Sequence, residues 1–192
     1  MKKSLFALMI FGACFTTNAQ NHGMLTGDTK LACEAILCLS TGQRPNECTP
    51  SLQRYFSISH KKWSDTVKDR RKFLNKCPSV KTEDNTMRQL VNAISEGAGR
   101  CDVASFNNLR SYAWDPNTET TKMVISNRMP SYCGAYWNHA YTDLDATAPV
   151  YVGDPARGGF WVEPAQYQQA LEKYNARIIL RRLLEPRIYR PG

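Results

Sequence analysis

Residues 25–48, LTGDTKLACEAILCLSTGQRPNEC, constrain the fold most strongly, because they combine a helix pattern with three cysteines. Asp28 or Thr29 is a candidate helix cap, and Gly42 with Pro45 marks the end. Between these limits, apolar residues recur at helical spacing: Leu31, Ala32, Ala35, Ile36 and Leu39. The pattern predicts a buried helix onto which other parts of the chain pack.

Two of these cysteines lie on the predicted helix and cannot pair with each other. Cys33 and Cys38 are five residues apart, so at ~3.6 residues per turn their side chains point about 140° apart. At a rise of ~1.5 Å per residue, their Cα atoms are roughly 8 Å apart, which exceeds disulfide geometry. Each cysteine therefore needs a partner elsewhere. Because two disulfides would connect this helix to other parts of the chain, we call it the hub helix and its two cysteines the hub cysteines.

The chain begins with a pattern typical of a secretory signal peptide. A lysine pair precedes the apolar run 5–11, and small residues follow as far as Ala19, after which we expect cleavage. The run is too short for a membrane span, which needs ~20 residues. An alternative has Cys14 lipidated, but phenylalanine stands where lipoprotein sites usually have leucine. We predict a signal peptide at 1–19 and a single disulfide-bonded domain at 20–192.

Removal of residues 1–19 from the 192-residue chain leaves 173 residues and six cysteines: Cys33, Cys38, Cys48, Cys77, Cys101 and Cys133. An even number in an exported chain predicts three disulfides, for which fifteen pairings exist. One pairing that suits the layout is Cys38 with Cys48, Cys33 with Cys77, and Cys101 with Cys133. Among these assignments, only the separate partners of the two hub cysteines follow from geometry.

A metal site is the rival interpretation of the cysteines. No CxxC pair occurs, and the histidines His22, His60 and His139 are not at ligand spacing, so we expect no metal and no cofactor. Disulfides form in an oxidising compartment. Combined with a bacterial type of signal peptide, this predicts the periplasm.

Basic residues are concentrated in two segments. Without Lys2 and Lys3 the formal net charge falls from +8 to +6; residues 61–76 carry seven basic and two acidic side chains, and residues 168–192 carry six and two. Such segments suit acidic partners, anionic lipid headgroups or nucleic acid, whereas the simpler interpretation is a solvated helix face. The candidate contact residues of the first segment are Lys68, Arg71 and Lys72.

Hydrophobic periodicity predicts a helical first half and a mixed second half. Beyond the hub, we expect helices at residues 49–58, 64–77, 84–97, 102–109 and 163–185. Residues 120–126 are a candidate strand, and 149–152 with 160–162 flank a glycine-bearing loop typical of a β-hairpin. We expect a mainly α (α+β) fold, in which a small β-hairpin packs on a disulfide-stabilised helical domain.

Seven of the seventeen aromatic residues of the mature chain lie between Tyr132 and Trp161. Flat aromatic faces with a polar edge suit peptide or sugar binding, although core packing is their ordinary role. The candidate contact residues of this half are Trp137, Tyr141 and Trp161. The position of His139 suits a histidine that is hydrogen-bonded within this aromatic cluster better than a histidine that acts as a ligand. The basic helices lack aromatic interleaving, which disfavours direct nucleic-acid binding.

No pattern in the chain is typical of catalysis. There is no GxSxG motif and no glycine-rich phosphate loop, and the thiols are expected to be oxidised. A cell-wall glycosidase would use a glutamate such as Glu34 or Glu47 with an aspartate. However, Glu34 suits an exposed helix position and Glu47 a turn. We therefore predict that the protein is not an enzyme.

Four segments of the chain resemble the TrbM/KikA family of plasmid conjugation proteins. They read LTGDTKLACEAILCLSTGQRPNECTPSLQRYFSI, HKKWSDTVKDRRKFLNKCP, MPSYCGAYWNHAYTD and GGFWVE, and together they span residues 25–163. The resemblance implies an exported periplasmic protein that accompanies a type IV secretion system in mating-pair formation. It implies no catalytic residues. The KikA branch is associated with killing of certain recipient hosts.

The function that we predict is a periplasmic accessory of conjugative type IV secretion that acts through protein–protein contacts in the cell envelope. No small-molecule substrate and no transmembrane segment in the mature chain are expected. One alternative is a peptidoglycan hydrolase that opens the cell wall for the secretion channel. Another is a killing protein that acts on the envelope.

Overall fold

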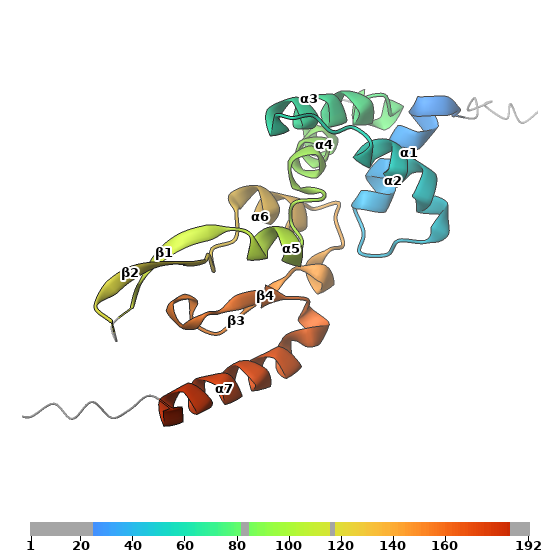
Figure 1. The fold of residues 1–192 in the computed structure, drawn as a ribbon. Helices are drawn as coiled ribbons and strands as arrows, with labels where there is room; N and C mark the ends of the chain where they lie inside the picture. Colours follow the sequence, from blue (N-terminus) through green and yellow to red (C-terminus); the bar gives the residue numbers. More distant parts are fainter. Residues whose placement is uncertain (1–24, 82–84, 116–117, 185–192) are drawn as a thin grey trace, which may run out of the picture.

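The computed structural model describes residues 25–81, 85–115 and 118–184 (Figure 1). The predicted signal peptide at 1–19 and the alternative lipid site at Cys14 lie outside these residues. Within the described residues, the chain is mainly helical, with two separate two-stranded antiparallel sheets. The mainly α (α+β) prediction is therefore confirmed.

Four helices form one end of the molecule (Figure 1). They are α1 (Gly27–Leu39), α2 (Thr49–Phe56), α3 (Trp63–Leu74) and α4 (Asn85–Gly97). α1 contacts the other three, and its predicted stripe is its buried side: Ala32, Ala35, Ile36 and Leu39 are buried, and Leu31 packs beside them. The helical periodicity of the sequence thus identified the central helix correctly.

Several helices begin or end a few residues away from the predicted positions, and α1 and α3 are two examples. α1 begins one residue before Asp28, after Thr26, and no side-chain hydrogen bond caps it. The Asp28 carboxylate instead forms ion pairs with Arg54 and Lys76, so a distant contact takes the place of the local cap. α3 ends at Leu74, three residues before the expected end at Cys77, and a separate 3₁₀ turn follows from Pro78.

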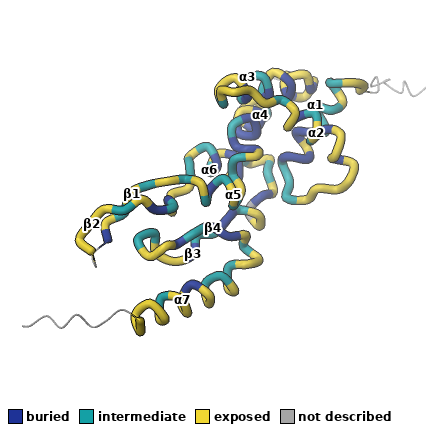
Figure 2. The backbone as a smooth tube through the Cα atoms, viewed as in Figure 1, coloured by how far each residue is buried: buried dark blue, intermediate teal, exposed yellow. Residues whose placement is uncertain are grey.

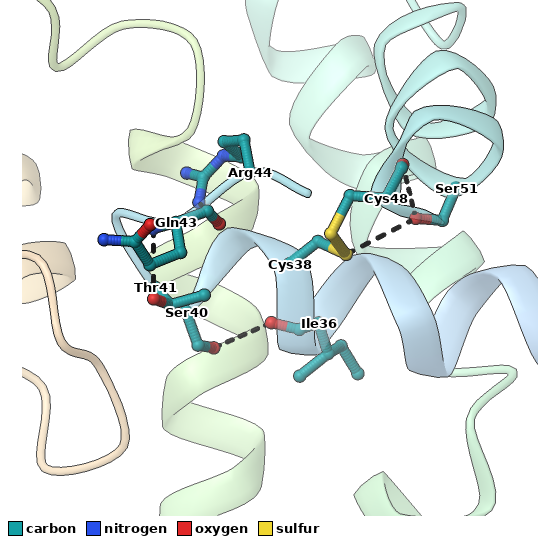
Figure 3. The surroundings of a disulfide bond; sticks show 8 residues. All are labelled: Ile36, Cys38, Ser40, Thr41, Gln43, Arg44, Cys48 and Ser51. Carbon is teal, nitrogen blue, oxygen red and sulfur yellow. Dashed lines mark hydrogen bonds between the residues drawn. A yellow bond between two sulfur atoms is a disulfide. The ribbon is translucent and has the colours of Figure 1, made fainter. Parts of the chain in front are cut away.

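Three disulfides connect the elements as the suggested pairing had them. Cys33 binds Cys77, Cys38 binds Cys48, and Cys101 binds Cys133, with Cα–Cα distances of 4.9, 5.8 and 5.6 Å. Figure 3 shows the second of these, beside which the hydroxyl of Ser51 donates to the Cys48 carbonyl at 2.9 Å. The two hub cysteines thus have separate partners, as the helical geometry requires.

The second half contains elements that the sequence analysis missed. Its helices and strands are α5 (Val103–Asn107), β1 (Arg110–Asp115), β2 (Thr120–Ile125), α6 (Ser131–Trp137), β3 (Val150–Val152), β4 (Phe160–Val162) and α7 (Tyr167–Leu184). The predicted strand is β2, and the predicted hairpin is β3–β4. β1 and α6 were not predicted. Both are short: β1 pairs with the neighbouring strand β2 in a hairpin, and α6 packs on α4, which is distant in the sequence.

The main core joins the helical end to the second half (Figure 2). Tyr136 on α6 is buried, and its hydroxyl donates to the carbonyl of Leu39 at the end of α1 at 2.5 Å. The ring of Phe106 lies edge-on to Trp137 and Trp161, with centroid distances of 5.7 and 4.8 Å. The aromatic residues of the second half therefore serve mostly as core.

A second, smaller core lies between α7 and the β3–β4 hairpin. Its buried members are Val152, Val162 and Tyr174. The Tyr174 ring lies against Gly153, where an added Cβ would lie 2.3 Å from the ring, and the φ of this residue is +81°. Glycine is needed here for both reasons. Among the described residues, no helix has the length and apolar character that a membrane crossing requires.

Candidate contact surfaces

A cationic groove lies between the end of α2 and one side of α3. Its volume is about 380 Å³, and we call it the α2–α3 groove. The residues that line it are Arg54, Ser57, Ile58, Ser59, His60, Asp69, Lys72, Phe73 and Lys76. Three cations and one carboxylate face the same space, so the groove suits an acidic ligand.

Ion pairs hold the cations of this groove in place. Arg54 Nε lies 3.1 Å from Asp28 Oδ1, and Lys76 Nζ lies 2.5 Å from Asp28 Oδ2. Hydrogen bonds from Arg54 and then from Lys76 lower the pKa of Asp28 from 3.8 to about 2. Across the groove, His60 Nε2 lies 2.8 Å from Asp69 Oδ2. The carboxylates connect α1, α2 and α3 and orient the basic side chains.

The structure separates the three basic residues that the sequence placed in one contact surface. Lys72 lines the α2–α3 groove, whereas Lys68 and Arg71 do not line it. Arg71 instead forms an ion pair with Glu96 on α4 at 3.2 Å, and Lys68 is exposed. The predicted basic surface is thus divided between a groove and a helix–helix ion pair.

One arginine of the basic segment belongs to the core. Arg70 is 6% exposed, and its guanidinium donates to the carbonyls of Ile58 and Ala98 at 3.1 and 3.2 Å. The same group lies 4.7 Å from the ring centroid of Tyr55 and 5.2 Å from that of Trp63. Cation–π contact and carbonyl acceptors together compensate for the burial of this charge. The role of this arginine is therefore structural.

Two of the three aromatic candidates are not at the surface. Trp137 and Trp161 are each 5% exposed, and the indole N–H of Trp161 donates to the carbonyl of Ser126 at 2.8 Å. This corrects the prediction that their faces are open to a partner, because core packing takes up both rings. Tyr141 is exposed, and its backbone N–H donates to His139 Nδ1 at 3.1 Å.

Among the described residues, the aromatic side chains with the highest exposed fractions lie on the β1–β2 hairpin, which was not predicted as a site. Tyr112, Trp114 and Met123 are 73%, 59% and 61% exposed. The register places Tyr112 opposite Met123, and alternation along β1 brings Trp114 to the same side. We call these three residues the hairpin face. The alternation in Arg110–Asp115 was the signal that would have revealed it.

An apolar groove of about 410 Å³ lies beside the Cys33–Cys77 disulfide. Its lining is Leu25, Cys33, Ile36, Leu37, Cys77, Pro78, Ser79 and Met87. Leu37 is exposed although it lies on the hub helix. The groove is thus a second exposed apolar surface, on the helical end of the molecule.

The carboxylates considered for catalysis lie apart from these surfaces. Glu34 forms an ion pair with Lys30 one helical turn away at 3.6 Å, and Glu47 is exposed on a 3₁₀ turn. Asp102 and Glu163 do line one cavity of about 250 Å³, below the roughly 300–1,000 Å³ of typical ligand pockets. Asp102 also caps α5 by accepting from the Ser105 N–H at 2.6 Å.

The cysteines considered as metal ligands are engaged with one another. Each of the six cysteines is in a disulfide. Among residues 25–81, 85–115 and 118–184, no group of three or more histidine, cysteine, aspartate or glutamate side chains could hold a metal ion.

Fold and surfaces together define a class: an α-rich domain that three disulfides brace and that presents apolar and cationic contact surfaces. A family model described as TrbM matches residues 24–175, and the chain belongs to this family. Membership of this family makes it a conjugal transfer-related protein. No curated protein and no solved structure matches it.

Proposed function

We propose that the protein is an exported, non-enzymatic accessory of plasmid conjugation, which contacts proteins of the mating-pair-formation or type IV secretion apparatus in the cell envelope. The observation that carries this proposal is the hairpin face. Solvent-exposed Tyr, Trp and Met side chains are typical of protein interfaces. Membership of the TrbM family supplies the process in which the partner takes part.

The α2–α3 groove supports a contact surface of a different chemistry. Arg54, Lys72 and Lys76 face the same space, and Asp28 orients two of them. An acidic segment of a partner would be attracted to this groove, and the hairpin face would supply apolar contact elsewhere. Protein binding therefore accounts for both surfaces, without a reaction.

Site-specific photocrosslinking in mating cells tests this function. A photoreactive phenylalanine analogue at Tyr112 is expected to capture an envelope protein of the conjugation apparatus. The matched control is the same analogue at Asn108, which is exposed at the end of α5 and outside the hairpin face. Equal labelling from both positions, or transfer and pilus assembly that do not change when the gene is deleted, would contradict the proposal.

Export is a separate part of the proposal, and the signal pattern and the three disulfides support it. The full chain in cells is expected to resist a maleimide reagent until it is reduced. A variant without residues 1–19 is expected to stay in the cytoplasm and to react with the reagent directly. Equal reactivity of the two forms would argue against export.

The peptidoglycan hydrolase remains the alternative, and the cavity with Asp102 and Glu163 is the observation that favours it. Purified protein incubated with cell-wall sacculi distinguishes the two functions. Release of muropeptides that Glu163→Gln abolishes would support the hydrolase and contradict the non-enzymatic function.

A further inference from the structure

The last helix carries two apolar stripes on opposite sides. The first stripe packs on the β3–β4 hairpin and consists of Tyr167, Ala170, Leu171, Tyr174 and Ile178. The second stripe, which we call the outer stripe, consists of Ala176, Ile179, Leu180 and Leu183. Its members follow the i, i+3, i+4, i+7 spacing of one helix face. All four are exposed.

The outer stripe points away from the rest of the molecule. Leu183 follows Tyr174 by nine residues, which at ~100° per residue places it about 180° around the helix from the buried ring. Figure 1 shows the second half of α7 at the edge of the fold, and Figure 2 shows it largely exposed. Leu183 is 77% exposed. No described segment covers this apolar face.

Arginines flank the outer stripe on both sides. Arg177 and Arg182 each lie about 110° from its centre at ~100° per residue, and Arg181 lies between them on the inner side. Residues 175–184 contain these three arginines and no acidic residue. Arg157 joins Arg181 and Arg182 in the lining of a neighbouring cavity, where Lys122 is paired with Asp115 at 2.6 Å. Asp154 lines an adjoining groove with Arg157 and Arg182, and the arginines leave this end of the molecule with an excess of positive charge.

The charge distribution decides which occupant fits. A second copy of the chain would bring its own Arg177 and Arg182 close to the same two arginines, and the contact would be repulsive. An anionic phospholipid bilayer offers both hydrocarbon for the stripe and phosphate groups for the arginines on either side. Helices with a narrow apolar face between cationic flanks lie in bilayer interfaces in this way.

The outer stripe lies outside the part of the chain that the TrbM family model matches. The TrbM family match ends at residue 175, and the outer stripe begins at Ala176. The second apolar side of the helix thus begins directly after the matched segment.

We propose that the end of α7 binds the surface of an anionic phospholipid bilayer. Ile179, Leu180 and Leu183 enter the interface, and Arg182 contacts lipid phosphates. Arg177, whose guanidinium donates to the Gly158 carbonyl at 2.8 Å, adds positive charge on the other flank. This contact would hold the protein at a membrane surface without a membrane-crossing segment, and it is distinct from the protein contacts proposed for the hairpin face.

Vesicle co-sedimentation of the mature chain, residues 20–192, tests the proposal. The protein is expected to bind vesicles of phosphatidylcholine mixed with phosphatidylglycerol, and to bind vesicles of phosphatidylcholine alone much more weakly. Leu183→Glu is expected to lower the partition coefficient about tenfold or more, because it places a carboxylate in the inserted face. Arg182→Gln is expected to lower it about fivefold, the effect of one cation near an anionic surface.

Two matched variants separate the outer stripe from general charge effects. Gln169→Glu adds the same carboxylate at an exposed position on the outer side of α7, two turns from the outer stripe's first residue. Lys68→Gln removes one positive charge from α3, on the helical end of the molecule. Both are expected to bind the anionic vesicles within about twofold of the wild type, since neither lies in the proposed interface.

Several outcomes would overturn the proposal. These are no binding to anionic vesicles at low ionic strength, equal binding to both lipid compositions, and unchanged binding by Leu183→Glu. Sedimentation equilibrium without lipid provides another test. If the wild type forms a dimer that Leu183→Glu dissociates, and the protein does not bind vesicles, the outer stripe is instead a contact with a second copy of the chain.

Discussion

Single side chains hold the helices of this protein together at points that the local sequence does not reveal. Asp28 joins α1 to Arg54 on α2 and to Lys76 beyond the end of α3. Tyr136 reaches from α6 to the last carbonyl of α1, and burial raises the pKa of its hydroxyl to about 12. Both residues act over more than 25 positions of sequence. Their contribution therefore depends on the assembled fold.

The Asp28 ion pairs predict a defined dependence of stability on pH. The folded pKa of about 2 is lower than the ordinary 3.8, so the carboxylate stabilises the fold above pH 3.8. This stabilisation is lost as the pH falls through 2. Asp28→Asn is therefore expected to lower the urea midpoint at neutral pH, and the difference from the wild type should shrink as the pH falls from 3.8 to 2.

Glu172→Gln is the control for this measurement, because it removes a carboxylate from an exposed position on α7. Its urea midpoint should follow that of the wild type across the same range of pH. A difference between Asp28→Asn and wild type that is independent of pH would show that the ion pairs do not stabilise the fold.

Two glycines on packed helices predict opposite effects of the same substitution. At Gly97 an added Cβ would lie 2.8 Å from Tyr136 Cβ, so Gly97→Ala is expected to destabilise the fold by about 1–3 kcal/mol. At Gly134, inside α6, the nearest atom is Asn138 Nδ2 at 3.9 Å. Gly134→Ala is expected to stabilise the fold by about 0.5–1 kcal/mol through helix propensity. Equal shifts of both unfolding midpoints would contradict this packing.

At the scale of elements, the disulfides determine how the short helices are connected. α2 and α3 have eight and twelve residues, lengths at which isolated helices are marginal in water. Cys33–Cys77 and Cys38–Cys48 fasten the segments around these helices to α1, and Cys101–Cys133 fastens the α4–α5 connection to α6. The cross-links therefore compensate for the limited stability of the individual elements.

Loop length predicts the order in which the disulfides contribute. Cys33–Cys77 spans 44 residues and Cys38–Cys48 spans 10. Replacement of the first pair by alanine is expected to lower the free energy of unfolding by about 4 kcal/mol, and of the second by about 3 kcal/mol, from loop-closure entropy. Urea titrations of the two double variants measure the difference. The reverse order would show that native contacts, rather than loop closure, dominate.

At the scale of the whole molecule, the described residues form two cores of unequal size. The main core joins α1, α3, α4 and α6, whereas the smaller one, between α7 and the β3–β4 hairpin, contains three buried residues. Tyr174 is the centre of the smaller core: its ring covers Gly153, and its hydroxyl accepts from the Asp154 N–H at 3.0 Å. Tyr174 is thus the one buried side chain through which α7 contacts the hairpin, among the described residues.

This arrangement predicts local unfolding when the smaller core is disrupted. Tyr174→Ala is expected to accelerate amide hydrogen exchange in α7 and in β3, because the helix loses its main buried contact. Exchange in α4, which lies in the main core, should remain close to that of the wild type. Tyr112→Ala is the control, since it removes an exposed tyrosine. Equal acceleration in α4 and α7 would indicate that the two cores unfold together.

The sequence predicted the elements that depend on local periodicity better than the elements that depend on contacts with other segments. Helices α1 to α4 were predicted because their apolar residues recur at a helical period, which is a local property. Separate partners for the two hub cysteines followed from helix geometry alone. In contrast, β1 acquires its structure by pairing with β2, and α6 by packing on α4. The seven residues of α6 carry too little local signal, whereas β1 shows the alternation of a strand and becomes ordered only with its neighbour β2.

The sequence by itself determined the helical class, the hub helix and the need for cross-links to distant segments, because periodicity and residue spacing specify them. Only the tertiary structure decided which aromatic and basic side chains face solvent. Trp137 and Trp161 are core and Trp114 is surface, although all three are tryptophans in the same half of the chain. Burial depends on what packs against a side chain, and those neighbours are far away in the sequence.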